Sequence, residues 1–351
     1  VCVIGGASAF LVDCSRVPGG PLGVIQPIFT CQLPVNRTKS RSQLNSVSFY
    51  LTLKAIIVLD IKCGVTQLPG GCMNIFENSL EPVRRIRRKV HERQQTGGVP
   101  AQQPDFNHEP LSSPADPKKY AGDLGILIVH GFTGSPHSLH PLAAYLAEKG
   151  YPVELPRLPG HGTHWRDMAV THYTDWIDSV EQAYELLTSA GYRVIVIGIS
   201  MGGCLAAHLA ARRPVAGTVL INPFFVDVNP LMRIAHRVAP VLPVMRSIGS
   251  DIAVPGVDEG AYARTPTASI RQLHLLGVET RELLPKLHAP VLYLRSVSDH
   301  TVTDASHHYF LQHVSASVEF KWLTRSYHVA TLDYDAELVK EFTHKFVQSL
   351  S

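Results

Sequence analysis

Cysteine is nearly absent from the main part of this sequence. Residues 73–351 contain only Cys204, and the other five cysteines all lie before Met73. No disulfide can form within residues 73–351, a pattern typical of a reducing compartment, and we therefore expect a cytoplasmic protein. Cys204 itself lies in an alanine-rich helical stretch, where a small buried hydrophobic residue is a better interpretation than a reactive thiol.

Strong charge, metal-ligand motifs and long apolar runs are missing as well. The formal net charge of +3 gives no reason to expect nucleic acid or an anionic membrane as a partner. There are 18 histidines but no His-Glu-x-x-His, and the adjacent His307 and His308 would point to different faces of a helix, so we expect no metal site. Lys54, Asp60 and Lys62 interrupt the apolar residues 47–65, which argues against insertion into a membrane.

Residues 1–72 differ in character from the rest of the chain. They show neither a sustained helical period nor strand alternation, and they contain no methionine. We interpret them as a non-native or disordered N-terminal extension ahead of a start at Met73, with a genuine small N-terminal domain as the alternative. Residues 73–119 indicate a basic helix near 80–93, most simply a solvated surface helix, and then a linker rich in Gln, Pro, Ser and Gly.

The most informative motif lies at residues 192–203. A β-branched run ends in Gly-Ile-Ser-Met-Gly at 198–202, and an alanine-rich helical pattern follows until Pro214. A serine at such a strand-to-helix turn is held in a strained backbone conformation that exposes its Oγ, and side chains at Gly198 or Gly202 would strike neighbouring backbone. The pentapeptide alone is a weak signal, but its context predicts that Ser200 is a nucleophile rather than a structural turn serine.

A nucleophilic serine needs a base, and the base needs an orienting acid. Asp299 follows a buried strand pattern at 289–296, and His328 follows an alternating pattern at 318–323. Both therefore stand on loops beyond strand ends, in the chain order serine, acid, histidine. We predict Asp299 as the acid and His328 as the base.

Neighbouring residues offer alternatives for these roles. Asp304 is better explained as the N-cap of a helix at 305–313, and Asp333 and Asp335 as caps of the last helix, at 335–349. His300 borders the acid but precedes His328 in the wrong order.

Two backbone amides are predicted to bind the oxyanion that forms on the substrate. The strand at 122–129 runs into a glycine-rich loop, His130-Gly-Phe-Thr-Gly, which leads to a helix. In such sites one amide follows the nucleophile and the other comes from this upstream loop, which indicates Met201 and Phe132. An ordinary strand-to-helix turn is the alternative for this loop. His161, in Leu-Pro-Gly-His-Gly at 158–162, is interpreted as stabilising its own loop rather than contacting substrate.

From residue 120 onwards, apolar strands alternate with helical patterns. Strands are predicted near 124–129, 152–155, 193–197, 217–221, 290–295 and 318–323, and helices near 138–149, 175–190, 202–212 and the C-terminus. This alternation predicts an α/β domain over residues 120–351 with a doubly wound, mainly parallel sheet.

The alternation stops between about 223 and 285, where a small helical cap is predicted, with a helix candidate at 267–276. The apolar side chains of Leu231, Ile234 and Val238 would bind the acyl or alcohol chain of a substrate; a packed helical excursion without such a role is the alternative.

Together the motifs resemble those of the bacterial carboxylesterase and monoacylglycerol lipase group of the α/β-hydrolase superfamily. The resemblance covers residues 120–350 and rests on the His130 loop, residues 158–163, residues 198–203, Ser298-Asp299 and residues 326–333, the last being the most specific. It implies an α/β-hydrolase fold, a serine esterase with Ser200, Asp299 and His328 as the triad and with oxyanion donors at Phe132 and Met201, and neither a metal nor an organic cofactor.

The expected reaction is hydrolysis of short- to medium-chain esters or monoacylglycerols through an acyl-enzyme, with a small-molecule ester as the partner. Other reactions of the same triad (acyl transfer, C–C bond hydrolysis or perhydrolysis) and a non-catalytic binding protein are the alternatives. The sequence leaves the oligomeric state open.

Overall fold

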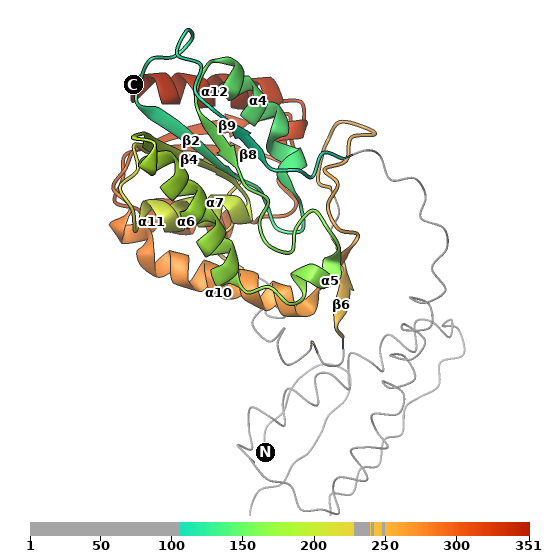
Figure 1. The fold of residues 1–351 in the computed structure, drawn as a ribbon. Coiled ribbons are helices and arrows are strands. Elements are labelled where there is room, and N and C mark those ends of the chain that lie inside the picture. Colours follow the sequence, from blue (N-terminus) through green and yellow to red (C-terminus); the bar gives the residue numbers. More distant parts are fainter. Residues whose placement is uncertain (1–105, 228–238, 240–241, 248–249) are drawn as a thin grey trace, which may run out of the picture. The chain divides into compact units, whose positions relative to one another are not determined.

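A computed structural model describes residues 106–227, 239, 242–247 and 250–351. These residues form an α/β structure in which helices cover a central sheet (Figure 1). The sheet has seven strands in the order β1-β3-β2-β4-β5-β8-β9. They are β1 (Leu111–Ser113), β2 (Leu124–Val129), β3 (Val153–Leu155), β4 (Arg193–Ile199), β5 (Gly217–Ile221), β8 (Val291–Ser296) and β9 (Val318–Leu323).

All neighbouring strands of this sheet run parallel except β1, which pairs antiparallel with β3. The predicted bounds of β2, β5 and β9 are confirmed, and β4 and β8 differ from their predicted bounds by two residues or fewer. Because β4, β5, β8 and β9 are consecutive and parallel, their carboxyl ends meet at one edge of the sheet. The loops that carry Ser200, Asp299 and His328 all leave from that edge, as the doubly wound prediction requires.

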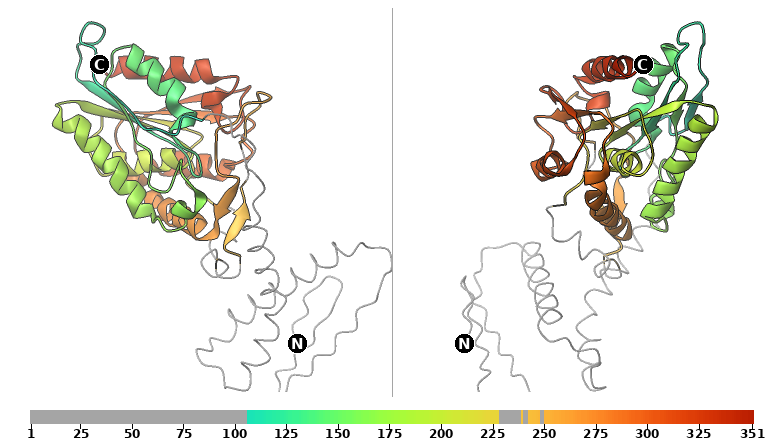
Figure 2. Two further views of the ribbon diagram at one scale, coloured as in Figure 1. Left: turned by 45° about the vertical axis from the view of Figure 1, so that its right-hand side comes forward. Right: turned by 90° about the vertical axis from the view of Figure 1, so that its left-hand side faces the viewer.

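The helices form two layers, one on each face of the sheet, as the views in Figure 2 show. One layer holds α4 (His140–Glu148) and α12 (Ala336–Ser349), which pack on the core that contains Ile126 and Ile128 of β2. The other holds α6 (Tyr173–Ser189), α7 (Met201–Ala210), α10 (Thr267–Leu283) and α11 (Asp304–His313), on the core that contains Leu127 and Val129. Successive side chains of one buried strand thus supply both cores.

Helix α6 illustrates why the sequence forms these layers. Its buried side chains include the adjacent Trp176 and Ile177 and then, at spacings of three or four residues, Val180, Tyr184 and Leu187, and they therefore lie on one face of the helix. That face packs on the sheet and on α7, while most of the side chains between them are exposed or half-buried.

Several local predictions need correction. Strand β1 lies inside residues 94–119, which were predicted to be a linker. Helix α10 continues seven residues beyond the predicted end at 276. The described part of the cap is not only helical, because β6 (Val244–Arg246) and β7 (Arg264–Pro266) form an antiparallel pair there.

Other predictions fall outside the described residues: the N-terminal extension at 1–72, the helix near 80–93, and Leu231, Ile234 and Val238 of the cap. Short elements that the sequence did not predict are α5 (Trp165–Met168) and the 3-10 turns Pro136–Leu139, Leu284–Lys286 and Ala330–Leu332. Within the part of the chain that the structure describes, every helix is too short or too polar to span a lipid bilayer.

Candidate active site

Ser200 is the single residue between the end of β4 and the start of α7. Its backbone has φ 55° and ψ −118°, a strained conformation that nearly all non-glycine residues avoid. The turn is held by hydrogen bonds from the Ser200 amide to the Ile221 carbonyl (3.0 Å) and from the Phe224 amide to the Ser200 carbonyl (3.0 Å). The residue is partly exposed, whereas α7 after it and all of β4 except Arg193 are buried. The turn therefore presents the hydroxyl outward from a rigid support.

The two glycines of the motif allow this turn because backbone approaches them closely. A Cβ at Gly198 would lie 2.1 Å from the Gly202 carbonyl oxygen, and a Cβ at Gly202 would lie 2.1 Å from the Val129 carbonyl oxygen. Neither oxygen belongs to a flexible side chain, so α7 could accept a larger residue only by moving away from β2 or β4.

Replacing Gly202 with alanine should therefore destabilise the fold by about 3 kcal/mol. The measurement is urea or thermal unfolding of the purified variant beside the parent protein. Gly131→Ala is the matched control, because a Cβ at Gly131 meets its nearest atom at an ordinary 3.5 Å. Equal stability of the two variants would contradict the close approach of α7 to β2.

Asp299 and His328, the predicted acid and base, lie side by side. His328 Nδ1 is 3.0 Å from Asp299 Oδ2, and the side chains are 8% and 0% exposed. A buried carboxylate at this distance accepts the Nδ1 proton, which leaves Nε2 with its lone pair free to act as a base.

The Asp299 carboxylate is fully engaged. Oδ1 accepts the amide protons of Thr301 (2.9 Å) and Val302 (2.8 Å), and Oδ2 also accepts a hydrogen bond from Arg295 (2.6 Å). Burial by itself would raise the pKa of Asp299, but the charge and hydrogen bond of His328, the Val302 amide and Arg295 outweigh it and hold the pKa below its usual value. Asp299 is therefore ionised at neutral pH.

Asp304, the alternative acid, has a different role. It is the first residue of α11, whose N-cap is Thr303, so the predicted N-cap position is wrong by one residue. Its carboxylate is 71% exposed and contacts Arg295 (3.0 Å). His300, the alternative base, is 60% exposed and pairs with Asp251 (2.9 Å).

Asn222 joins the serine turn to the histidine loop, and no sequence pattern indicated this role. It directly follows β5 with φ 44°, and it is completely buried. Its Nδ2 donates to the His328 carbonyl (2.8 Å) and to Ser296 Oγ (2.9 Å), and its Oδ1 accepts the Ser296 amide proton (2.8 Å). Because Ile221 beside it accepts the Ser200 amide proton, this short segment connects the serine turn, the end of the strand before Asp299, and the His328 loop.

Two further carboxylates hold the histidine loop in place, a role that the sequence did not predict for either of them. Asp251 accepts the His328 amide proton (3.2 Å), and its own carbonyl accepts the Val329 amide proton (3.1 Å). Asp333 accepts amide protons from Tyr327 (2.8 Å) and from Ala253 (2.8 Å) of the cap segment. The segment at 251–254 is thereby bound to the loop that carries His328.

Asp333 and Asp335 were expected to cap the last helix, and this expectation is wrong in its chemistry. Asp335 does occupy the N-cap of α12 but makes no side-chain cap hydrogen bond. Its carboxylate instead accepts the amide protons of Arg325 (2.8 Å) and Ser326 (3.0 Å) in the loop before His328.

The loop predicted to supply an oxyanion amide lies against the serine turn. A Cβ at Gly131 would lie 3.5 Å from the Ser200 Cβ, which places Gly131, the residue before Phe132, beside the Ser200 side chain. Thr133, next along, has φ 62°, and its carbonyl accepts the Tyr262 amide proton of the cap (3.0 Å). Met201 is the first residue of α7, where amides have no partner within the helix. Both candidate amides thus belong to residues next in sequence to Ser200 or to its neighbour Gly131.

Two buried histidines shape this loop. His130 Nε2 accepts the Leu158 amide proton (3.1 Å), so its Nδ1 donates to the Gly131 carbonyl (3.0 Å). His161 Nδ1 bonds the Pro159 carbonyl (3.0 Å), consistent with the predicted role in its own loop. Burial lowers the pKa of His130 to about 4 and that of His161 to about 3, so both rings are neutral at neutral pH.

Glu259 is a further acid near the site that the sequence did not reveal. Its Oε2 faces Gly134 of the oxyanion loop, at 3.6 Å from where a Cβ would stand. Burial raises the pKa of the Glu259 carboxyl to about 7; a positive charge on His328 opposes the rise, and Asp258 and Asp251 add to it. Near neutral pH this carboxyl therefore changes between a hydrogen-bond donor and an anion.

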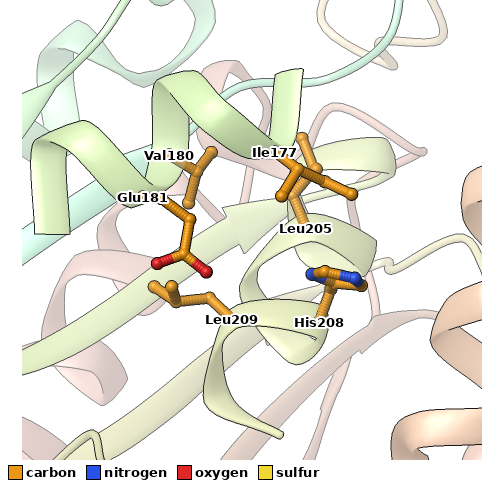
Figure 3. A pocket seen from close by; sticks show the side chains of 6 residues that line it. All are labelled: Ile177, Val180, Glu181, Leu205, His208 and Leu209. Atoms are coloured by element: carbon orange, nitrogen blue, oxygen red, sulfur yellow. The ribbon is translucent and has the colours of Figure 1, made fainter. Parts of the chain in front are cut away.

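A recess between α6 and α7 is separate from these residues (Figure 3). Its lining is Ile177, Val180, Glu181, Leu205, His208 and Leu209. His208 bonds Glu279 of α10 (3.0 Å), so it links two helices. In the described ranges, no three histidine, cysteine, aspartate or glutamate side chains are grouped so that they could hold a metal ion.

The sequence of this chain is similar to those of known proteins. The sequence model of the family described as serine aminopeptidase, S33, matches residues 123–335. A thermostable monoacylglycerol lipase of Bacillus sp. (strain H-257) is 43% identical over 242 residues, which are 68% of this chain and 96% of that protein. A carboxylesterase of Bacillus subtilis (strain 168) is 28% identical over 236 residues, 65% of this chain and 94% of the other.

A solved structure is similar to this chain as well. A structure from a study of LipS and LipT, two metagenome-derived lipolytic enzymes, has a TM-score of 0.65 and 35% identity, and the match covers 69% of this chain and 98% of the other. The predicted α/β-hydrolase fold and the predicted resemblance are confirmed.

Proposed function

This chain belongs to the α/β-hydrolase family described as serine aminopeptidase, S33, and we propose that it hydrolyses carboxylic esters through Ser200, His328 and Asp299. It is an enzyme of the carboxylesterase and monoacylglycerol lipase type. The observation that carries the proposed mechanism is the buried pair of Asp299 and His328, at the same sheet edge as a strained, partly exposed serine.

In the proposed reaction, Ser200 Oγ attacks the ester carbonyl carbon while His328 Nε2 takes the hydroxyl proton. Asp299 keeps the imidazole in the required tautomer and stabilises its positive charge. The tetrahedral intermediate collapses when His328 returns the proton to the leaving alcohol. Water, deprotonated by His328, then attacks the acyl-enzyme. The bond to Ser200 Oγ breaks as His328 returns that proton to the oxygen, and the carboxylic acid is released.

The negative oxygen of each tetrahedral intermediate would be bound by the amides of Met201 and Phe132. Met201 begins α7, so the positive end of the helix dipole adds to its amide. The Phe132 loop is supported by neutral His130 and by the bond from Tyr262 to Thr133. Donors that are already oriented before the reaction contribute most to such a step.

We infer that the alcohol part of the substrate lies near Glu259, whose carboxyl is close to His328 and to Gly134. A partly exposed carboxyl that titrates near neutrality suits the hydroxyl groups of glycerol, because it can both donate and accept hydrogen bonds. The acyl chain would be covered by the apolar cap residues Leu231, Ile234 and Val238, a proposal that rests on the sequence.

A panel of p-nitrophenyl esters and monoacylglycerols of graded acyl length tests this function. We expect kcat/KM to rise by up to about fourfold for each of the first methylene groups, because each one buried contributes about 0.8 kcal/mol. The rise should stop once the pocket is filled. The measurement is kcat/KM at fixed pH for each chain length.

The cap variant Leu231→Asp should raise KM for long esters more than for acetate. A flat chain-length profile in the parent protein, unchanged in this variant, would contradict the acyl-binding role of the cap. Absence of ester hydrolysis across the whole panel would contradict the proposed function itself.

A further inference from the structure

Arg295 is a buried cation in direct contact with the proposed catalytic acid. It stands on β8, a strand whose residues are all buried, and its own side chain is only 3% exposed. Its Nη1 donates to Asp299 Oδ2 at 2.6 Å. Its Nη2 donates to the Val302 carbonyl (2.8 Å) and to Asp304 (3.0 Å). The guanidinium thus spans the loop at 299–304 from one end to the other.

The oxygen that Arg295 contacts is the one that binds the base. Asp299 Oδ2 accepts both from Arg295 Nη1 and from His328 Nδ1 (3.0 Å), so guanidinium and imidazole share a single carboxylate oxygen. Two cations that contact the same anion repel each other, so each one makes a positive charge on the other less favourable. A guanidinium carries its charge at every working pH, whereas an imidazole can lose its charge.

We propose that Arg295 is a positioning residue that keeps His328 neutral, and therefore available as a base, down to a lower pH than Asp299 alone would allow. This inference rests on the proposed function, because it assumes that His328 is the base of the reaction. Arg295 also holds the acid loop by contacting three of its residues, and this second effect must be separated from the first by experiment.

Other charged groups surround this arrangement. His328 is faced by Asp251 at its amide and by the Glu259 carboxyl, both of which favour a positive imidazole, and exposed His300 lies beyond Asp251. Around Arg295, Tyr293 and His307 lie within electrostatic range, and burial raises the pKa of Tyr293 and lowers that of His307.

Arg295 contacts two carboxylates, and only one of them is open to solvent. The side chain of Asp304 is 71% exposed, whereas that of Asp299 is 0% exposed. Solvent therefore screens the charge of Asp304, and most of the opposing effect of Arg295 on His328 remains.

The experiment is the pH dependence of kcat/KM for a short p-nitrophenyl ester, from about pH 5 to pH 9, with full-length protein. In Arg295→Met, which removes the charge and keeps an apolar chain, the acidic limb should move to higher pH by about one unit. Arg295→Lys keeps a charge and should hold the limb within about 0.3 unit of the parent. A merely structural role would lower the plateau and leave the limb where it is.

Two further variants test the direction and the size of the shift of the acidic limb. Asp304→Asn is the matched control, because it removes the exposed partner of Arg295 and should leave the limb within about 0.3 unit. Glu259→Gln removes an anion that favours a positive His328, so its limb should move in the opposite direction, to lower pH. If Arg295→Met does not fold, Arg295→Gln replaces it, since glutamine is uncharged and can still donate a hydrogen bond to Asp299.

An unshifted limb in an active Arg295→Met or Arg295→Gln variant would overturn the role of Arg295, and so would an equal shift in Arg295→Lys. A parent protein that hydrolyses no ester and reacts with no fluorophosphonate would instead overturn the proposed function. The two failures are distinguishable because the first requires an active parent enzyme.

Discussion

Replacing Ser200 with alanine should lower kcat/KM for ester hydrolysis by about 10⁵-fold or more, while the protein remains folded. Only the hydroxyl oxygen is removed, and the hydrogen bonds that hold the turn belong to the Ser200 backbone amide and carbonyl, which alanine keeps. His328→Ala should cost a similar factor, because serine and histidine act as one unit and the loss of either abolishes the same step. The measurement is kcat/KM with a short p-nitrophenyl ester, beside an unfolding curve for each variant.

Fluorophosphonate labelling provides an independent readout of the same prediction, because this reagent reacts only with an activated serine. The parent protein should be labelled stoichiometrically, and the Ser200→Ala variant should not be labelled. Ser298→Ala is the matched control, since Ser298 is exposed and lies beside Asp299 in the acid loop, and it should keep both activity and labelling. More than a few per cent of residual activity in Ser200→Ala would show that another group is the nucleophile.

The sheet could be predicted from the sequence because its strands are buried on both faces. Such strands appear as short, continuous apolar runs, and those at 124–129 and 217–221 have the predicted ends. Strand β1 could not be found in this way, because Leu-Ser-Ser is short and half exposed and is held mainly by its pairing with β3. That strand depends on its pairing with a segment distant in sequence, and such pairing leaves no local pattern in the sequence.

Helix α10 shows a different limit. Its predicted end at 276 stands directly before Gly277, a residue that often ends a helix. In the structure Gly277 lies inside the helix, where the Phe224 ring and the Phe225 carbonyl both come to 3.1 Å from the place of a Cβ. The glycine is needed for close packing of α10 on the segment after β5, and a sequence pattern cannot distinguish this use from a helix end.

The proposed triad could be predicted because each member follows a recognisable strand, in a chain order that one fold requires. The residues that support it were missed for a common reason. Asn222, Asp251 and Asp333 act by binding backbone groups of segments 77 to 106 residues away or of their own loop. Any polar residue on a loop could do so, and only the folded structure shows which ones do.

Asp299→Asn should lower kcat/KM by about 10⁴-fold, while Asp304→Asn should leave it nearly unchanged. Asp299 accepts four hydrogen bonds, two on Oδ1 from backbone amides and two on Oδ2 from Arg295 and His328. An asparagine has only one oxygen, so its NH₂ group must face two donors whichever way the amide is turned. With NH₂ toward His328, the imidazole is forced into the wrong tautomer, and Nε2 carries the proton that it should accept.

The same conflict predicts a loss of stability. A buried amide that faces two donors leaves hydrogen-bonding groups unsatisfied, at a cost of about 1 to 3 kcal/mol, so Asp299→Asn should also unfold at lower urea concentration than the parent. Asp304→Asn should not, because its carboxylate is 71% exposed and water can replace its contact with Arg295. Kinetics and unfolding curves of the two variants therefore form one comparison. If Asp304→Asn were the inactive variant, the acid of the triad would be Asp304, and the buried contact between Asp299 and His328 would be structural only.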